Sequence, residues 1–324
     1  MDERTTMQQF IKLMVLSTLL SVFSSILNAG PWFTGPLLAP AGHTVPRGHT
    51  NFELYGIDIL TNGRYDQSGT VIHTPLTRSF VANPIITHGF TNWLDVQLIL
   101  PYVFNSTQGE RYNRLSDVSV ALGFQLLEQK SRHDHFDFRL LVQETFPTGR
   151  FDNLNPAQAG TDATGLGSYQ TQIGLNFQHL IQLFGSHYLR TRLILNRNFA
   201  GSVRVNGLNS FGGSVKTQGQ IAPGAENTGD LAFEFTLNQH WVAVLEGTAS
   251  TGQATRFNGI LNVGSIGNTS VSIGNNKYHE RSLAPALEYN FNSNVGLIGG
   301  VWFPVRGQNT AHFKTYILAL NTYW

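Results

Sequence analysis

The sequence contains no cysteine, little charge and, after residue 29, no long apolar run. Without cysteine the chain forms no disulfide, no thiolate zinc site and no lipoprotein-type lipid anchor. Charged residues make up 13% of the chain, against roughly 25% in typical soluble domains. The 21 basic and 20 acidic residues nearly balance, so no basic stripe indicates a nucleic-acid partner. Low charge without long apolar runs favours a β-sheet with one face against lipid.

Residues 1–29 have the pattern of a secretory signal peptide. Lys12 precedes the apolar run LMVLSTLLSVFSSIL at residues 13–27. This run is about 15 residues long, shorter than the roughly 20 that a membrane-spanning helix needs. Asp2 and Glu3 are acidic, although such signals usually begin with basic residues. We therefore predict a signal peptide, and a membrane-anchoring or buried helix is the alternative.

Residues 30–50 are rich in proline and glycine and show no apolar period. Pro31, Pro36, Pro40 and Pro46 lack the backbone N–H that a β-ladder requires. We predict that this stretch is an extended periplasmic lead-in or a partial plug in the mouth of the domain that follows.

Twelve strand-like stretches follow. Most of them are close in length to the roughly 9–11 residues that a tilted strand needs to cross a bilayer. The last of them alternates with period two, which is the mark of a strand with two different faces. It ends on the aromatic residue Trp324, as the closing strand of a membrane barrel does. The twelve stretches cover residues 51–60, 78–91, 94–104, 117–127, 135–145, 168–182, 188–198, 230–237, 241–248, 280–291, 295–305 and 310–324.

The connections between these stretches alternate in length. Short turns lie at residues 92–93, 128–134, 184–186, 238–240 and 292–294, and longer connections at 61–77, 105–116, 146–167, 199–229 and 249–279. Bacterial outer-membrane barrels have an even strand number, short periplasmic turns and long outer loops. A soluble sandwich, the alternative fold, gives no reason for this segregation.

We therefore predict that residues 51–324 form an all-β, antiparallel, up-and-down transmembrane barrel of about 12 strands in the bacterial outer membrane. The barrel must close, because an open edge would leave unpaired backbone groups in lipid. The expected partners are outer-membrane lipid and lipopolysaccharide. The barrel-assembly machinery is a further expected partner, through the C-terminal strand that ends at Trp324.

Strand parity separates a lipid-facing set of side chains from a lumen-facing set. The candidate lumen-lining residues are Asp137, Arg139, Gln143, Gln170, Gln172, Asn176, Arg190, Arg192, Glu234, Glu246 and Glu288. Their charges have both signs, which predicts a mixed field rather than strong selectivity for one ion sign. Two interpretations stay open: these residues line a pore, or they pair across a filled interior and hold it rigid. Barrels of about eight strands are filled by side chains, and barrels of about 16–18 strands enclose a water channel. Twelve strands lie between these two cases, so we expect a narrow or plugged passage.

No stretch carries a recognisable catalytic or metal-binding motif. The sequence has neither a Gly-x-Ser-x-Gly elbow nor a phosphate-binding loop. His133 and His135 lie in a charged turn, where solvation is a better explanation than metal binding. We expect no enzymatic activity, no cofactor and no catalytic, cofactor-binding or metal site. A barrel-borne lipase or protease is the most distant alternative, since geometry defines such a site.

One short motif points to a family. A strand ends at residues 146–149 in the sequence FPTG, and a loop rich in glycine and asparagine follows. Together with the signal peptide, the hairpins and the terminal aromatic, this resembles the outer-membrane transporters grouped under the MetA pathway of phenol degradation. The resemblance covers about residues 51–324 and implies a barrel that admits small apolar or aromatic compounds. It supplies no catalytic residues.

Two functional hypotheses follow. The first is a passive outer-membrane channel or transporter for small molecules, including hydrophobic or aromatic ones. The alternative is a structural or adhesive outer-membrane barrel whose surface loops meet a host or the environment, without transport.

Overall fold

The computed structural model describes residues 30–131, 136–261 and 273–324, and Trp32–Trp324 form one compact unit. The predicted signal peptide and the pair His133 and His135 lie outside the described residues. In the described ranges, no helix is long and apolar enough to cross a membrane. The helical element described there is a single short turn, η1 (Pro156–Gln158).

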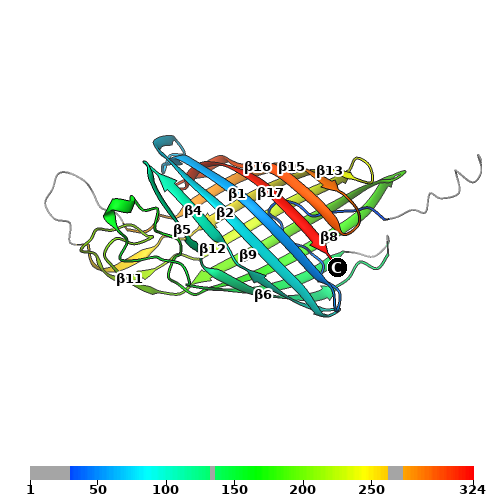
Figure 1. Ribbon diagram of the computed structural model, residues 1–324, viewed down its shortest axis with the longest axis horizontal. Helices are drawn as coiled ribbons and strands as arrows, with labels where there is room; N and C mark the ends of the chain where they lie inside the picture. Colours follow the sequence, from blue (N-terminus) through cyan, green and yellow to red (C-terminus); the bar gives the residue numbers. More distant parts are fainter. Residues whose placement is uncertain (1–29, 132–135, 262–272) are drawn as a thin grey trace, which may run out of the picture. The chain divides into compact units, whose positions relative to one another are not determined.

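Twelve antiparallel strands of the described chain close into a barrel, in which they run at a steep tilt (Figure 1). The ladder closes because β1 pairs with β17 on one side, where Asn51 lies opposite Tyr323, and with β2 on the other, where Thr50 lies opposite His88. The predicted fold is confirmed. The barrel strands are β1 (Thr50–Tyr65), β2 (Val71–Thr91), β3 (Leu94–Ile99), β6 (Val118–Leu127), β7 (Asp137–Phe146), β8 (Gln170–Phe184), β9 (His187–Ala200), β12 (Glu226–Thr236), β13 (Trp241–Gly252), β15 (Tyr278–Asn290), β16 (Val295–Gln308) and β17 (Ala311–Tyr323).

The connection predicted at residues 61–77 is wrong, because β1 and β2 continue through most of it. The Asp66 carboxylate closes the turn by accepting hydrogen bonds from the backbone N–H groups of Ser68 and Thr70, at 2.8 and 2.9 Å. A side chain that replaces ladder partners in this way makes a tight turn possible. The two strands therefore project beyond the predicted span as a paired ribbon.

The loop predicted at residues 105–116 is also wrong. The third strand is interrupted at Pro101, which lacks a backbone N–H, and continues as β4 (Tyr102–Thr107) along the outer half of β2. It then turns at Gln108 and Gly109, both with positive φ, into β5 (Glu110–Leu115). The β4–β5 hairpin lies beyond the strand pair β3 and β6.

A second, small sheet forms from two of the long connections. It consists of β10 (Val203–Asn206), β11 (Gln218–Ala222) and β14 (Arg256–Ile260). Val203, Val205 and Ile221 are buried in it, and Phe257 packs against them. Residues 199–229 and 249–279 were expected to be without strands, and this expectation is wrong for these three stretches.

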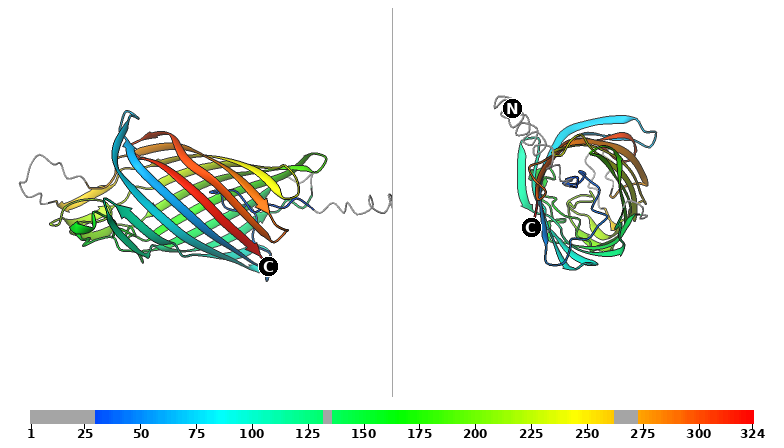
Figure 2. Two further views of the ribbon diagram at one scale, coloured as in Figure 1. Left: turned by 45° about the horizontal axis from the view of Figure 1, so that its top comes forward. Right: turned by 90° about the vertical axis from the view of Figure 1, so that its right-hand side faces the viewer.

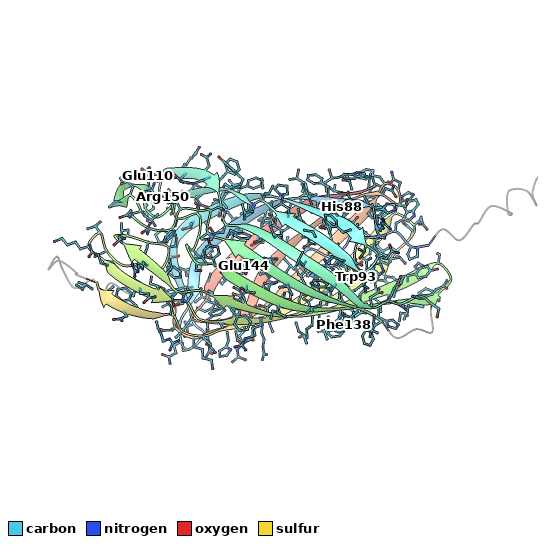
Figure 3. The ribbon with its side chains drawn as sticks, turned by 90° about the horizontal axis from the view of Figure 1, so that it is seen from below. His88, Trp93, Glu110, Phe138, Glu144 and Arg150 are labelled. Atoms are coloured by element: carbon cyan, nitrogen blue, oxygen red, sulfur yellow. The ribbon has the colours of Figure 1, made fainter. Side chains whose placement is uncertain are left out.

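The outer face of the barrel is apolar and its inner face is polar. Leu193, Phe233 and Leu287 are 40–44% exposed, although they lie in the middle of paired strands. Their neighbours on the other parity, such as Arg192 and Glu234, are buried. In Figure 3 the side chains surround the barrel wall, with Trp93 and Phe138 near one end and Glu110 and Arg150 near the other. The first end carries the short turns and is the periplasmic end by the usual rule.

Candidate functional site

Residues 32–49 form an extended segment inside the barrel, and we call them the inner segment. The end-on view in Figure 2 shows this blue trace within the ring of strands. The segment has bends and turns but no strand of its own, because three prolines deprive it of ladder donors. Leu37, Ala39 and Thr44 are at most 4% exposed. The inner segment therefore occupies much of the space that an empty barrel would leave open.

The carboxylate of Glu246, on β13, holds the middle of the inner segment. Its two oxygens accept hydrogen bonds from three consecutive backbone N–H groups, those of Leu37, Leu38 and Ala39, at 2.5, 3.1 and 2.9 Å. Consecutive N–H groups that converge in this way bind an anion well. Glu246 is fully buried, so these hydrogen bonds replace the water that its charge has lost.

A second group of polar side chains holds the start of the inner segment. The backbone N–H of Thr34 donates to the carboxylate of Glu288, and its hydroxyl donates to Asn290 Oδ1 at 3.0 Å. The amide of Asn290 in turn donates to the carbonyl oxygen of Trp32 at 3.2 Å. From β17, Asn321 donates to the carbonyl oxygen of Thr34 at 3.3 Å. Side chains of β15 and β17 thus position the start of the inner segment.

An ion pair holds the far part of the inner segment. Arg139 Nη2 lies 2.5 Å from Asp95 Oδ1, and both side chains are 1% exposed. The second oxygen of Asp95 accepts from the backbone N–H of Val45 at 2.9 Å. Arg139 and Asn176 both donate to the carbonyl oxygen of Ala41, at 3.4 and 3.2 Å. The pair is therefore neutralised internally and also binds the segment.

Glu234 lies between two arginines on the neighbouring strand β9. Arg190 Nε donates to Glu234 Oε2 at 2.6 Å, and Arg192 Nε lies 3.4 Å from the same oxygen. Arg192 also donates to the carbonyl oxygen of Ala39 at 3.1 Å. The Arg190 guanidinium lies 4.1 Å from the centre of the Phe33 ring, a cation–π contact. Buried charges of both signs therefore pair with each other and with the inner segment.

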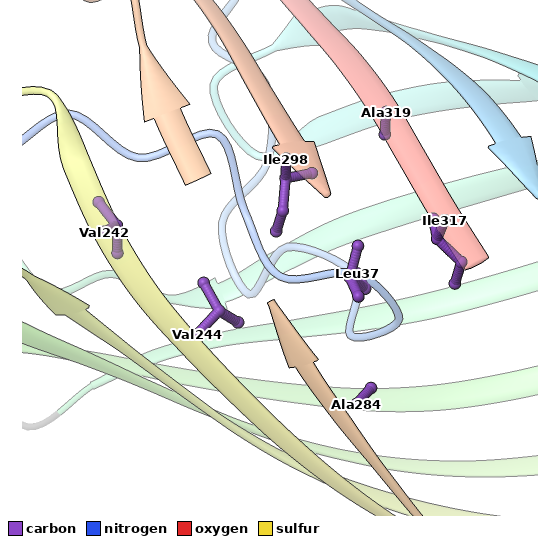
Figure 4. Close-up of a cluster of buried hydrophobic side chains, with 7 residues drawn as sticks. All are labelled: Leu37, Val242, Val244, Ala284, Ile298, Ile317 and Ala319. Atoms are coloured by element: carbon purple, nitrogen blue, oxygen red, sulfur yellow. The ribbon is translucent and has the colours of Figure 1, made fainter. Parts of the chain in front are cut away.

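The inner segment also supplies an apolar anchor. Leu37 packs among buried side chains that point inward from four strands (Figure 4). These side chains are Val242, Val244, Ala284, Ile298, Ile317 and Ala319. Burying one leucine side chain contributes about 1.5–3 kcal/mol, which adds to the polar contacts.

Glycines in the wall make room for the inner segment. A Cβ atom added at Gly296 would collide with the Thr34 hydroxyl, and one at Gly300 would lie 2.5 Å from Leu37 Cδ1. A Cβ atom at Gly89 would collide with the Pro46 carbonyl oxygen. A strand interior normally disfavours glycine, so these positions indicate close packing of the segment against the wall.

A cavity of about 380 Å³ remains between the inner segment and the wall. This volume is at the low end of the roughly 300–1,000 Å³ typical of small-molecule sites. Polar atoms without a hydrogen-bond partner are buried around it, including Asn83 Oδ1, Thr87 Oγ1 and Asn196 Oδ1. Its charged borders include two acids and two arginines, which nearly cancel. The charged and further amide-bearing residues of the lining are Glu53, Asp95, Arg139, Arg192, Asn51, Gln97, Gln143, Gln172 and Asn321.

The structure places the candidate lumen residues in three settings. Asn176, Glu234, Glu246, Glu288, Arg139, Arg190 and Arg192 contact the inner segment or one another, as described above. Gln143 and Gln172 border the cavity. Asp137 accepts from the backbone N–H of Gln129 at 2.8 Å, and Gln170 accepts from Asn198 at 2.9 Å, so these two serve the wall rather than the inner segment.

The list of candidate lumen residues omitted two of the residues that matter most here. Asp95 and Asn290 hold the inner segment, yet neither was among the candidates. Both were detectable, because Asp95 shares its parity with Gln97 in a predicted strand and Asn290 shares its parity with Glu288. Glu53 and Tyr55 also border the cavity. The alternation did not identify them, because the outward-facing positions of the first strand include both apolar and charged residues. Asp58 is outward there and pairs with Arg78 at 2.7 Å.

In the described ranges, no group of three or more His, Asp or Glu side chains is placed to hold a metal ion. The contacts of the lumen bind and position a peptide segment. The expectation that the protein is not an enzyme stays a prediction.

The barrel is similar to a solved outer-membrane channel. That channel, from Pseudomonas putida F1, superposes with a TM-score of 0.66 at 12% identity, over 89% of this chain and 100% of the channel. The toluene transporter TodX of Pseudomonas putida matches at 10% identity over 85% and 87% of the two chains, with a TM-score of 0.36. The translocator domain of the autotransporter NalP from Neisseria meningitidis matches at 9% identity over 84% and 88%, with a TM-score of 0.44.

These likenesses concern the fold. At 12% identity the first of them establishes the outer-membrane barrel architecture and agrees with the predicted location. No protein-family model matches the sequence, and no curated protein does.

Proposed function

We propose that the protein is a passive outer-membrane channel for small molecules, with a passage narrowed by the inner segment. The observation that carries this proposal is that side chains, not a β-ladder, hold residues 32–45 in the lumen, while Gly48 and His49, next to β1, form backbone hydrogen bonds with Gly89 of the wall. The wall is complete without them, since its twelve described strands pair with each other. A segment held in this way can shift without breaking the barrel, and the cavity beside it already has room for a small solute.

The lining favours small neutral polar permeants. Asn83, Thr87 and Asn196 offer buried polar atoms without partners, and a solute with hydroxyl or amide groups would satisfy them. Acids and arginines border the cavity in equal number, so neither ion sign gains a large advantage. The resemblance to the MetA-pathway transporters favours small apolar or aromatic compounds instead, and Leu141 and Ile57 give the cavity an apolar part.

A transport assay with three solute classes tests the proposal. The purified protein is reconstituted into liposomes, and the entry of a neutral polyol, a matched carboxylate and a phenol is measured. We expect faster entry of the polyol than in protein-free liposomes, and slower entry of the carboxylate. Faster entry of phenol alone would favour the aromatic class. No entry of any solute, with a flat current in planar bilayers, would contradict the channel.

A surface-binding role is the second candidate. The sheet of β10, β11 and β14 has its own buried core, which stabilises the outer connections as a defined surface. If adhesion is the function, replacing β10 and β11 by a short linker abolishes binding to a surface while solute entry is unchanged. If this variant without β10 and β11 instead loses solute entry but keeps surface binding, the result would contradict the adhesive role.

A further inference from the structure

An apolar groove of about 470 Å³ crosses the outer face of the barrel, between β8 and β13. Its floor lacks side-chain bulk, because Gly229 on β12 has no side chain and the small Ala249 lies opposite it on β13. Leu195 lies opposite Gly229 on the other side, on β9. Ile173 and Leu175 form its border on β8. The groove therefore results from small residues in register on neighbouring strands.

The groove lies in the outer half of the membrane. Leu237, directly after β12, is at the short-turn end, and Asn227 of β12 is ten residues before it in the chain. At about 3.3 Å per residue and a tilt of about 45°, Asn227 lies about 23 Å from that end. The apolar band of such barrels is about 25 Å tall. Gly229 is thus below the outer edge of the band, at the depth of the acyl chains of the outer leaflet.

Arginines without carboxylate partners surround the upper end of the groove. Arg197 is exposed, donates to Asn227 Oδ1 at 3.3 Å and stacks 4.9 Å from the Phe199 ring. Arg281 lies opposite Ala249 and also directly opposite Arg306, and both of these arginines are exposed. In the described part of the chain, none of the three arginines forms an ion pair.

Like charges directly opposite on neighbouring strands are destabilising. Arg281 and Arg306 are in this arrangement at the outer edge of an apolar surface, where water is scarce. A bound anion would remove the repulsion. A phosphate group is the anion that several arginine side chains bind best.

We propose that the groove binds lipopolysaccharide, the phosphorylated glycolipid of the outer leaflet. One acyl chain lies over Gly229 and Ala249, and the phosphates contact Arg197 and the pair Arg281 and Arg306. The apolar slot, the cationic border and the depth together match this lipid. A phospholipid of the inner leaflet would meet the barrel at the opposite end, far from these arginines.

Native mass spectrometry of the purified full-length protein with deep-rough lipopolysaccharide tests the proposal. We expect about fivefold weaker binding for R197Q and about twentyfold or more for R281Q/R306Q, at about 1 kcal/mol per cation. Lipopolysaccharide without its phosphates should bind the unmodified protein more weakly than the intact lipid binds the double variant, because it also loses the contact with Arg197. Gly229→Leu should weaken binding several-fold by filling the slot.

The matched control is R111Q/R114Q, which removes two exposed arginines of β5 and should leave the affinity unchanged. Gly229→Leu is compatible with the fold, because a Cβ atom there would meet only Leu195 Cδ2, at 3.8 Å. Heat-modifiable migration in gels verifies that each variant is folded. Unchanged binding by folded R281Q/R306Q would overturn the proposal, and so would equal binding of phosphatidylglycerol.

Discussion

Glu246 is the residue on which the position of the inner segment depends most. Its carboxylate accepts three backbone N–H groups from residues more than 200 positions away in the chain. A hydrogen bond to a charged group contributes about 1.5–3 kcal/mol, and these three act on one short stretch. In return, the inner segment satisfies a charge that would otherwise be buried without partners.

We predict that Glu246→Ala releases the inner segment. Losing about 3 kcal/mol of net interaction shifts the docking equilibrium by about 150-fold, so the mean conductance in planar bilayers should rise. Backbone amides at residues 37–39 should exchange hydrogen faster. Glu110→Ala, at an exposed site on β5 near the outer end (Figure 3), is the control and should behave as the unmodified protein. Equal exchange rates in both variants would refute this role for Glu246.

Gly296→Ala tests the packing of the inner segment against the wall. The added methyl group collides with the Thr34 hydroxyl, so we expect faster amide exchange around Thr34 and a higher conductance. The added Cβ atom would also lie 2.8 Å from Asn290 Oδ1 on β15, so the unfolding free energy of the barrel should not increase. Gly229→Ala, which meets no close atom, should leave the conductance unchanged and raise the unfolding free energy by up to about 1 kcal/mol, since alanine is favoured over glycine in a strand. A conductance increase in both variants would contradict the prediction.

At the scale of elements, the inner segment depends on the wall, but the strand pairing of the wall does not depend on the inner segment. Every strand of the described barrel pairs with two neighbours, and the inner segment adds no pair to this ladder. The contacts of Glu246, Glu288 and Asp95 are spread over separate strands. We therefore expect the segment to open at a lower free energy than the barrel wall.

We predict that replacing residues 34–45 by a glycine–serine linker of equal length leaves the barrel folded and raises its conductance several-fold. The linker lacks Leu37 and Thr34, so it gains neither the apolar anchor nor the side-chain hydrogen bonds at that site. Circular dichroism measures the β content, and planar-bilayer recording measures the conductance. A folded variant with unchanged conductance would show that the inner segment does not limit the passage.

At the scale of the whole molecule, an apolar exterior and a polar interior decide where the barrel lies. Leu193, Phe233 and Leu245 remain exposed in the folded chain, which is costly in water and favourable in lipid. The interior balances its charges by ion pairs, as between Arg139 and Asp95, or by hydrogen bonds from the inner segment, as at Glu246. The balance of these two faces, rather than any single contact, holds the barrel in the membrane.

Phe233→Arg places a charge in the apolar band and should reduce the unfolding free energy in a bilayer by about 2–4 kcal/mol. Chemical denaturation of the protein in phosphatidylcholine vesicles measures this change. Val215→Arg, at a 61% exposed site in an outer connection, is the control and should change it by less than about 0.5 kcal/mol. A loss of similar size in both variants would argue against a lipid-facing Phe233.

The C-terminal strand completes the barrel and is also our proposed contact for the assembly machinery. Trp324 is 62% exposed, and its backbone exchanges two hydrogen bonds with Thr50, at 2.8 and 3.0 Å. Trp324→Ala keeps these backbone bonds. We therefore predict slower insertion in cells, measured by pulse-chase fractionation, with unchanged stability once folded in detergent. Normal insertion kinetics would refute a role for this ring in assembly.

The wall was predictable because its signal is local. In β7, Leu140 and Val142 alternate with Arg139 and Gln143, and period two by itself assigns these side chains to opposite faces. The prediction failed at residues 61–77 and 105–116, where strands continue beyond the membrane and lose the apolar alternation. It also failed in β10, β11 and β14, whose core joins two distant connections.

The sequence by itself determined the strand number, the two faces and the polar character of the interior, because each follows from the repeat of neighbouring residues. Only the tertiary structure decided what the interior does. Parity placed Glu246 and Arg192 in the lumen, but no local pattern states that they bind residues 37–39, which lie 153 to 209 positions earlier. That choice depends on the closure of the barrel, which brings distant strands around one short segment.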